Sequence, residues 1–199
     1  ERPAKRLGRF LQHLRALRTM PGLDDKRPFV ALKIAVLTVS DTRVLADDKS
    51  GDTLAARIAQ AGHELADRVI VPDDVEKIRA RVRTWIADPA VDVVITTGGT
   101  GFTGRDVTPE ALEPLFEKRM DGFSTVFHRI SYDKIGTSTV QSRATAGVAG
   151  ATFIFVLPGS PGACKDAWDG ILVHQLDYRY MPCNFVEIMP RLDEHLRRG

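Results

Sequence analysis

A glycine-rich stretch at residues 96–106, Thr-Thr-Gly-Gly-Thr-Gly-Phe-Thr-Gly-Arg-Asp, has the composition of a loop that binds phosphate. Glycines let backbone N–H groups approach an anion closely, and successive N–H groups can form an anion-binding nest. Arg105 could neutralise phosphate charge, and Asp106 could coordinate Mg²⁺. The alternative is a plain tight turn with Asp106 as a helix-capping residue. Because a turn does not require four glycines, we expect ligand contacts from Gly98, Gly99, Thr100 and Gly101.

Two familiar nucleotide-binding motifs do not account for this loop. Gly99, Gly101 and Gly104 fit the spacing G-x-G-x-x-G, but in the dinucleotide fingerprint the glycines themselves open the helix. Here three residues follow Gly104 before Thr108 and Pro109, which predict a helix start with a cap and an N-terminal proline. No Gly-Lys-Ser/Thr follows the glycines, so the Walker pattern is missing too. A more general anion-binding role remains.

Polar residues also follow three other apolar runs that read as strands. Residues 34–39, 68–71, 91–97 and 154–157 are strand-length and β-branched, as expected for strands buried on both faces. Ligands of open parallel sheets bind beyond the carboxyl ends of the strands. The candidate residues after these ends, besides the glycine loop, are Ser40, Asp41, Asp73, Asp74, Pro158, Gly159 and Ser160.

The elements between these runs predict how the loops are positioned. Apolar residues at helical spacing indicate helices at 52–61, ended by Gly62, and across Val75–Ile86. Strands that alternate with helices imply right-handed crossovers. We therefore expect an α/β three-layer sandwich with a mostly parallel central sheet.

Length and composition limit the function classes. At 199 residues and 22.0 kDa the chain suits one domain, and a net charge of +2 gives no argument for nucleic acid. No apolar run approaches the roughly 20 residues of a membrane span. Cys164 and Cys183 form neither a disulfide framework nor a zinc-ligand pattern, so reduced thiols are expected. With no signal peptide visible, we expect a cytoplasmic protein.

Residues 1–30 are predicted to be an extension of a domain at 31–199. A basic amphipathic helix is indicated by an apolar stripe of Leu7, Phe10, Leu11, Leu14 and Leu17, surrounded by basic side chains. Such a helix can lie on a membrane, on an acidic partner or on its own assembly. An exposed stripe would be a solubility liability, so we expect the arm to pack against its own assembly without contributing to the active loops.

The run 96–109, TTGGTGFTGRDVTP, closely resembles the central motif of the molybdopterin-binding family that includes the bacterial MoaB and MogA proteins. Further segments resemble the MoaB branch, at residues 38–41, 50–51, 135–138, 141–144, 157–160 and 181–185. The similarity extends from about residue 33 to 185 and excludes the arm. It implies a trimer or a hexamer, possible contacts with other enzymes of the pathway, and either molybdenum or tungsten chemistry.

The resemblance also implies a reaction: adenylylation of molybdopterin by Mg-ATP with release of pyrophosphate. Asp73 and Asp106 match the two aspartates associated with that activity, so we expect them to be catalytic and to hold Mg²⁺. The glycine loop would bind phosphates, while Ser142, Arg143 and residues 158–160 would hold the pterin or its phosphate. For Ser142 a turn-capping role is an equally good interpretation.

Two rival functions stay open. One is a carrier or scaffold that binds molybdopterin without transferring AMP. The other is a nucleotide-handling hydrolase, since similar glycine-threonine loops occur in the competence-damage protein family. The MoaB-like segments at 135–144 and 181–185 argue against the hydrolase.

Overall fold

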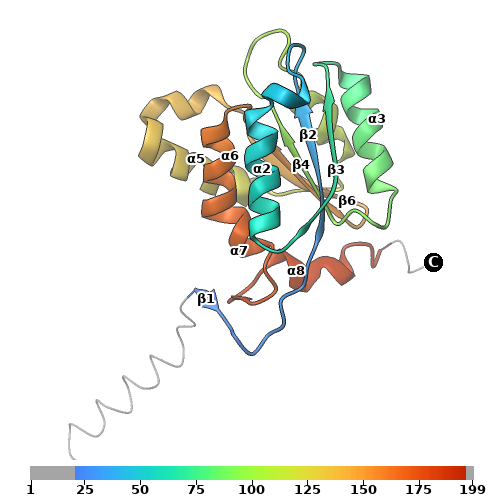
Figure 1. The fold of residues 1–199 in the computed structure, drawn as a ribbon, viewed down its shortest axis with the longest axis vertical. Coiled ribbons are helices and arrows are strands. Elements are labelled where there is room, and N and C mark those ends of the chain that lie inside the picture. The colour runs from blue at the N-terminus through green and yellow to red at the C-terminus, as the bar shows by residue number, and fades with distance from the viewer. Residues whose placement is uncertain (1–20, 196–199) are drawn as a thin grey trace, which may run out of the picture.

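The computed structural model describes residues 21–195, which form one six-stranded sheet with helices on both faces (Figure 1). The sheet order is β3-β2-β4-β7-β6-β5. Its strands are β2 (Lys33–Val39), β3 (Glu64–Val71), β4 (Val93–Thr97), β5 (Lys118–Arg119), β6 (Thr145–Ala149) and β7 (Thr152–Leu157). β3, β2, β4 and β7 are parallel neighbours, whereas β6 runs antiparallel to both of its neighbours, β7 and β5. The predicted fold class, a mostly parallel α/β sandwich, is confirmed.

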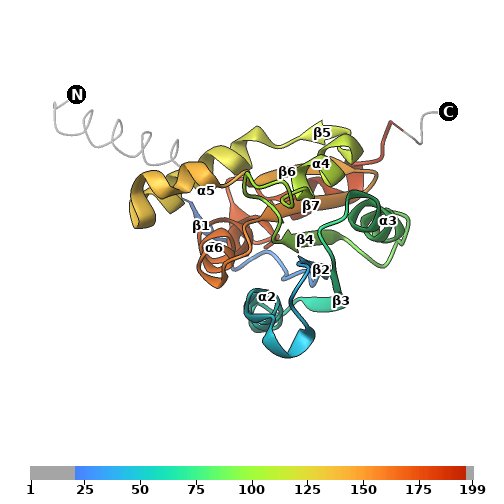
Figure 2. The same cartoon turned by 90° about the horizontal axis from the view of Figure 1, so that it is seen from above.

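The helices divide into two layers because the strands alternate their buried side chains between the two faces (Figure 2). One face packs against α2 (Lys49–Gln60), α5 (Asp121–Ile135), α6 (Pro161–Ala167) with its π-helical continuation η4 (Trp168–Leu172), and α8 (Phe185–Ile188). The other face packs against α3 (Val75–Ile86) and α4 (Thr108–Leu112). Short 3₁₀ segments are η1 (Leu45–Asp47), η2 (Glu113–Leu115), η3 (Gly136–Gln141) and η5 (Met189–Arg191), and α7 is Val173–Gln175.

A second, two-stranded sheet lies at the end of the molecule where the described chain begins (Figure 1). β1 (Gly22–Leu23) pairs antiparallel with β8 (Tyr180–Met181). Asp24 N–H adds a hydrogen bond to the Arg179 carbonyl at 2.8 Å. The predicted basic helix of the arm falls within residues 1–20, outside the described residues.

The predicted elements exist, but most of their boundaries differ. The helix at Val75–Ile86 is confirmed at both ends. The strand predicted at 68–71 begins earlier, at Glu64, and the strand predicted at 154–157 begins at Thr152. The strand predicted from residue 91 begins at Val93. The helix predicted at 52–61 starts at Lys49, because Asp48 accepts a hydrogen bond from Gly51 N–H and caps it there.

Both cysteines are free thiols, as the sequence predicts. Cys164 is fully buried, and burial raises the pKa of its thiol to about 11, while Cys183 is exposed. Within residues 21–195 the structure has no helix of the length and hydropathy that a membrane crossing requires.

Candidate active site

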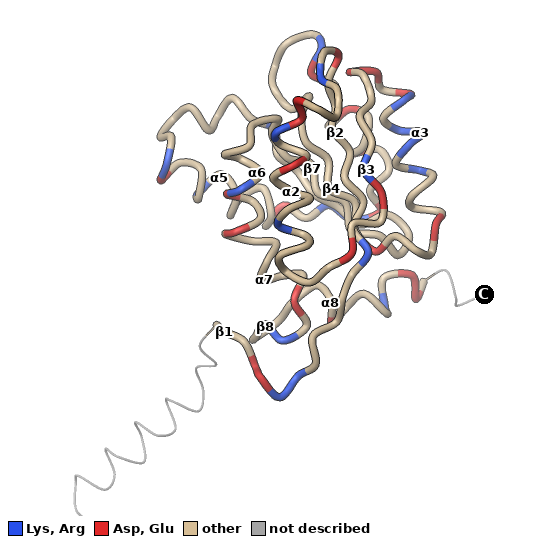
Figure 3. Tube along the Cα trace, viewed as in Figure 1, with Lys and Arg blue, Asp and Glu red and all other residues tan. Residues whose placement is uncertain are grey.

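Four loops meet at the carboxyl edge of the parallel strands, at the upper end of the view in Figure 1. Ser40 N–H donates to the Val71 carbonyl at 2.9 Å, which joins the ends of β2 and β3. Gly98 N–H donates to the Leu157 carbonyl at 3.1 Å, which joins β4 and β7. Figure 3 shows acidic and basic residues close together on the loops beyond β2. The sequence-predicted loops are therefore brought together.

The glycine loop turns sharply directly after β4. Gly98 has φ +104° and Gly99 has φ +64°, a region that favours glycine. Thr108 Oγ donates to the Gly98 carbonyl at 2.8 Å, and Thr108 N–H donates to the Gly99 carbonyl at 3.0 Å. The prediction that Thr108 caps α4 is wrong, because Val107 is the cap residue and the Thr108 hydroxyl is used by the loop. Thr108 therefore fixes the two glycines. Because Gly98 N–H is already bonded to the Leu157 carbonyl, the predicted anion contact through backbone N–H groups can begin only at Gly99.

Gly98→Ala is expected to destabilise the protein strongly. A methyl group at this position would overlap the backbone carbonyl of Val39, and a positive φ costs a non-glycine residue about 1–2 kcal/mol. Together with overpacking, we expect a loss of at least about 2 kcal/mol of unfolding free energy. Thermal denaturation measures it, with Gly104→Ala as the control because nothing lies within 4 Å of a Cβ there. Equal melting temperatures for both variants would contradict the proposed constraint.

Three carboxylates surround this loop. A Cβ on Gly99 would stand 2.9 Å from Asp73 Oδ1, and one on Gly101 would stand 2.8 Å from Asp106 Oδ2, so both aspartates lie against the loop. Asp41 Oδ1 accepts a hydrogen bond from Asp73 N–H at 3.1 Å. Arg105 pairs with Asp41, its Nε donating to Oδ2 at 2.8 Å. The structure therefore groups Asp41, Asp73, Arg105 and Asp106.

The two predicted catalytic aspartates differ in their electrostatics. Burial raises the pKa of Asp73, and the negative charges of Asp41 and Asp106 raise it further. The Thr103 hydroxyl, which donates to Asp106 Oδ2 at 2.6 Å, holds the pKa of Asp106 below its ordinary value. Asp106 is therefore firmly ionised, whereas Asp73 would be stabilised as a carboxylate by a bound cation.

The donor set fits magnesium held jointly with a nucleotide. Within residues 21–195 no group of three or more Asp, Glu, His or Cys side chains forms a complete metal site. Mg²⁺, however, usually takes one or two carboxylates and completes its octahedron with phosphates and water. Asp73 and Asp106, beside a loop suited to phosphate, supply that kind of partial site.

Arg143 is bound to the glycine loop itself. Its Nε donates to the Gly101 carbonyl and its Nη2 to the Asp106 carbonyl, both at 2.9 Å, and its Nη1 pairs with Glu110. The guanidinium also lies 5.5 Å from the ring centroid of Phe102. Arg143 therefore holds the loop that carries Asp106, and its predicted direct contact with the pterin stays a prediction.

Ser142, unlike its neighbour Arg143, has a side chain that is not bonded to the glycine loop. Its Oγ is buried and makes no hydrogen bond to any described residue. The turn-capping interpretation of its side chain is therefore not realised. An unpaired buried hydroxyl is costly, so a ligand atom is a reasonable partner.

The loop at 158–160 packs closely on the glycine loop. The Pro158 carbonyl accepts a hydrogen bond from Thr97 Oγ at 2.8 Å, and Ser160 Oγ caps α6 by accepting from Ala163 N–H at 3.1 Å. A Cβ on Gly159 would stand 3.1 Å from Gly98 Cα, so glycine permits this approach. The predicted ligand contacts of this loop remain a prediction.

A buried ionic network beneath the site was not predicted. Asp48 is fully buried and accepts hydrogen bonds from Thr38 Oγ and Arg68 Nη2, each at 2.8 Å. Arg43 connects this network to the site, because its Nη1 donates to Ser50 Oγ at 2.6 Å and its Nη2 to the Gly159 carbonyl at 3.0 Å. The helix predicted at 52–61 begins four positions after Asp48, so no direct sequence signal indicated that Asp48 caps it.

A cavity of about 470 Å³ adjoins Asp41. Val44 and Leu45, exposed by 60% and 58%, form an apolar part of its wall. The remaining lining residues are Ser40, Asp41, Arg43, Arg68, Val69, Ile70, Val71 and Pro72. A cavity of this volume, with apolar walls and a few charged groups, suits a small organic ligand.

The fold and this edge of the sheet define an α/β protein in which strand-end carboxylates lie beside a glycine loop suited to an anionic ligand. The chain belongs to the family described as "Probable molybdopterin binding domain", which matches residues 35–178. It is 51% identical to "Molybdenum cofactor biosynthesis protein B" of Escherichia coli K12 over 157 residues, covering 79% of this chain and 92% of that protein. The protein of the same name from Bacillus subtilis is 41% identical over 146 residues, covering 73% and 86%.

Solved structures show the same similarity. The tungsten cofactor synthesizing protein MoaB from Pyrococcus furiosus superposes with a TM-score of 0.69 at 34% identity, covering 84% of this chain and 99% of that chain. The protein CinA from Thermoplasma acidophilum shares the fold with a TM-score of 0.51 at 16% identity, covering 71% of this chain and 96% of that chain. At that identity the likeness to CinA concerns the fold alone.

Proposed function

We propose that this protein acts in molybdenum cofactor biosynthesis and transfers AMP from Mg-ATP to the terminal phosphate of molybdopterin. The observation that carries the proposal is that Asp73 and Asp106 both lie against the glycine loop, beside Gly99 and Gly101. Their different electrostatics are the second support, since one aspartate is firmly ionised and the other favours a nearby cation. The family and its relatives named for this pathway make molybdopterin the first candidate substrate.

The reaction needs positioning more than covalent help from the protein. An oxygen of the molybdopterin phosphate attacks the α-phosphorus of ATP, a new P–O bond forms, and the bond to the β-phosphate bridging oxygen breaks. Pyrophosphate leaves with that electron pair. Magnesium, when bound, would offset the charge of the phosphates and of the leaving group.

The residues of the chain have separable tasks in this scheme. Asp106 and Asp73 would hold the cation and the phosphates in line for attack. N–H groups of the glycine loop would bind phosphate oxygens, while Arg143 and Thr108 keep that loop in shape. Arg43 would position the 158–160 loop through the Gly159 carbonyl.

Incubation of the purified protein with molybdopterin and Mg-ATP tests the proposal. We expect adenylyl-molybdopterin by mass spectrometry, one pyrophosphate released for each product formed, and loss of both when EDTA removes magnesium. A carrier or scaffold would bind molybdopterin without releasing pyrophosphate. That result would refute the adenylylation while leaving the pathway assignment standing.

Self-association into a trimer or hexamer is part of the proposal. Within residues 21–195, the C-terminal part of α5 and the following η3 expose apolar side chains, namely Tyr132, Ile135 and Val140. Apolar side chains clustered on a surface are typical of protein interfaces. This face is therefore the first candidate for contact between copies.

A further inference from the structure

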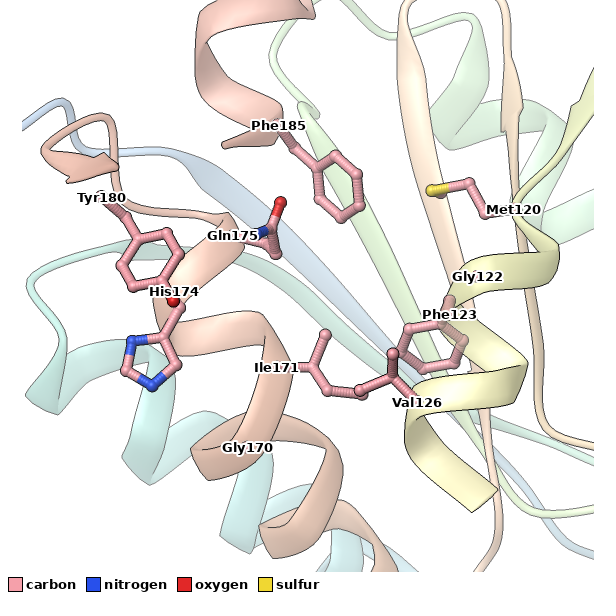
Figure 4. Close-up of a pocket in the computed structure, with 10 residues that line it drawn as sticks. All are labelled: Met120, Gly122, Phe123, Val126, Gly170, Ile171, His174, Gln175, Tyr180 and Phe185. Atoms are coloured by element: carbon pink, nitrogen blue, oxygen red, sulfur yellow. The ribbon is translucent and has the colours of Figure 1, made fainter. Parts of the chain in front are cut away.

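A second cavity lies away from the site, near the two-stranded sheet and between α5 and the helical segment η4–α7 (Figure 4). Its volume is about 410 Å³. Its lining is Met120, Gly122, Phe123, Val126, Gly170, Ile171, His174, Gln175, Tyr180 and Phe185. None of these residues belongs to the four loops of the candidate active site, so the proposed reaction does not account for the cavity.

The cavity offers a preformed apolar surface. Phe185 packs against Phe153 and Phe155 with ring centroids 4.9 and 5.9 Å apart, which fixes one wall. Phe123 is also held by Phe155, with ring centroids 5.2 Å apart, whereas Val126 is 46% exposed at the edge. An apolar hollow of this size is rarely left uncovered in a protein, because contact of its walls with water is unfavourable.

The described chain begins beside this cavity. Tyr180 lines it and is paired with Leu23 in the β1–β8 sheet, and Gly22 is paired with Met181. Residues 1–20 precede Pro21 and contain the apolar stripe of Leu7, Phe10, Leu11, Leu14 and Leu17. Three residues, 18–20, separate Leu17 from Pro21, and they span at most about 14 Å if extended across their four bonds. The stripe is therefore tethered within reach of the cavity.

We propose that the N-terminal arm folds back as a helix and inserts its apolar stripe into this cavity of its own chain. As a helix, residues 7–17 would be about 16 Å long. A helix this short is marginal alone and requires a partner surface to become stable. A short tether gives an effective concentration on the order of millimolar, which favours the chain's own cavity over that of another copy.

Disulfide trapping in the full-length chain tests the docking. Cys183→Ser removes the exposed thiol, and Cys164 is left in place because it is fully buried. Gly122→Cys supplies a thiol at the cavity, where nothing lies within 4 Å of the new Cβ. It is combined in turn with Leu7→Cys, Leu11→Cys and Leu14→Cys, each under mild oxidation.

Two controls match these variants. Gly162→Cys, in α6 next to the 158–160 loop, also has nothing within 4 Å of its Cβ but lies at the active-site end of the sheet. Ala16→Cys lies on the side of the predicted helix opposite the stripe. Circular dichroism verifies that every variant is folded before oxidation.

At least one stripe cysteine is expected to form an intramolecular disulfide with Gly122→Cys, at least tenfold faster than with Gly162→Cys. Ala16→Cys should react with Gly122→Cys at the slow control rate. Val126→Asp, which places a charge at the edge of the cavity, should slow the trapping at least tenfold. Control-level rates for all three stripe cysteines would overturn the proposal. Disulfide-linked dimers without the intramolecular product would overturn it too, because a second copy would then supply the arm.

Discussion

Replacing Asp106 or Asp73 with asparagine is expected to lower the rate of AMP transfer by about 10²-fold or more, because each change removes a charge needed at the transition state. Asparagine has nearly the same shape, so the hydrogen bond from the Thr103 hydroxyl to position 106 can persist. The fold should therefore be retained. Initial rates of pyrophosphate release measure the effect, and melting temperatures verify that the variants are folded.

Asp74→Asn is the matched control for Asp73. Asp74 is adjacent in sequence, but its side chain caps α3 by accepting from Lys77 N–H at 2.9 Å. Asparagine caps helices as well as aspartate does, so this variant should keep both rate and stability. Parental turnover in Asp73→Asn and Asp106→Asn would show that the active-site assignment is wrong. Loss of cooperative unfolding would instead show that these carboxylates are structural.

The pH dependence of the same reaction follows from the electrostatics of Asp73. Its pKa is raised by burial and by Asp41 and Asp106, so in the free protein it takes up a proton at a higher pH than an ordinary aspartate. Activity that needs this carboxylate is therefore present above the raised pKa and is lost as the pH falls through it. Asp41→Asn removes one of the like charges and should move the acid limb of kcat/KM to lower pH. An unchanged acid limb would show that Asp73 does not control it.

The sequence predicts most of the central sheet because local patterns decide it. The apolar run in β2 and the one-sided apolar pattern of α3 are complete within their own segments, and α3 is predicted at both ends. β6 was not predicted, since Thr145–Ala149 is rich in small residues and resembles no apolar strand. The formation of β6 as a strand depends on its antiparallel pairing with β7, a tertiary contact that the local sequence does not reveal.

The candidate site also divides into a part that local sequence predicts and a part that depends on tertiary contacts. The ends of parallel strands meet at one edge of a sheet, so the sequence alone predicts that the loops containing Asp41, Asp73 and Asp106 lie close together. Which side chain supports which loop could not be predicted, because the partners are far apart in sequence. Arg43 reaches the carbonyl of Gly159, and Arg143 reaches that of Gly101. Both arginines are bound to the loops, a role that residue type alone does not distinguish from ligand binding.

Asp48→Asn is expected to cause the largest loss of stability. Asp48 is fully buried and bonded to Arg68, whose side chain is only 18% exposed. Removing one partner of a buried ion pair typically costs about 3–5 kcal/mol, because the remaining charge is left uncompensated. For a chain of this size, each kcal/mol lowers the melting temperature by roughly 2–4 °C. Calorimetry at neutral pH should therefore show a fall of roughly 10 °C.

Asp52→Asn is the control, since Asp52 pairs with the same Arg68 at 2.7 Å but is 60% exposed. An exposed pair contributes about 1 kcal/mol or less, so this variant should melt close to the parent. Similar melting temperatures for Asp48→Asn and Asp52→Asn would show that burial of the pair is not the decisive factor.

The effect of Asp48→Asn should also depend on pH. Burial acts to raise the pKa of Asp48, but hydrogen bonds from Arg68, Gly51 N–H and Thr38 outweigh it and hold the pKa below its ordinary value. A carboxyl whose pKa is lowered by folding stabilises the fold above its unfolded pKa of about 3.9, and this contribution is lost as the pH falls through the lowered value. The stability difference between parent and variant should therefore be constant from neutral pH down to about pH 5 and should shrink below about pH 4. A difference that persists undiminished at pH 2 would mean that the shape and hydrogen bonding of the side chain at position 48, and not its charge, stabilise the buried network beneath the site.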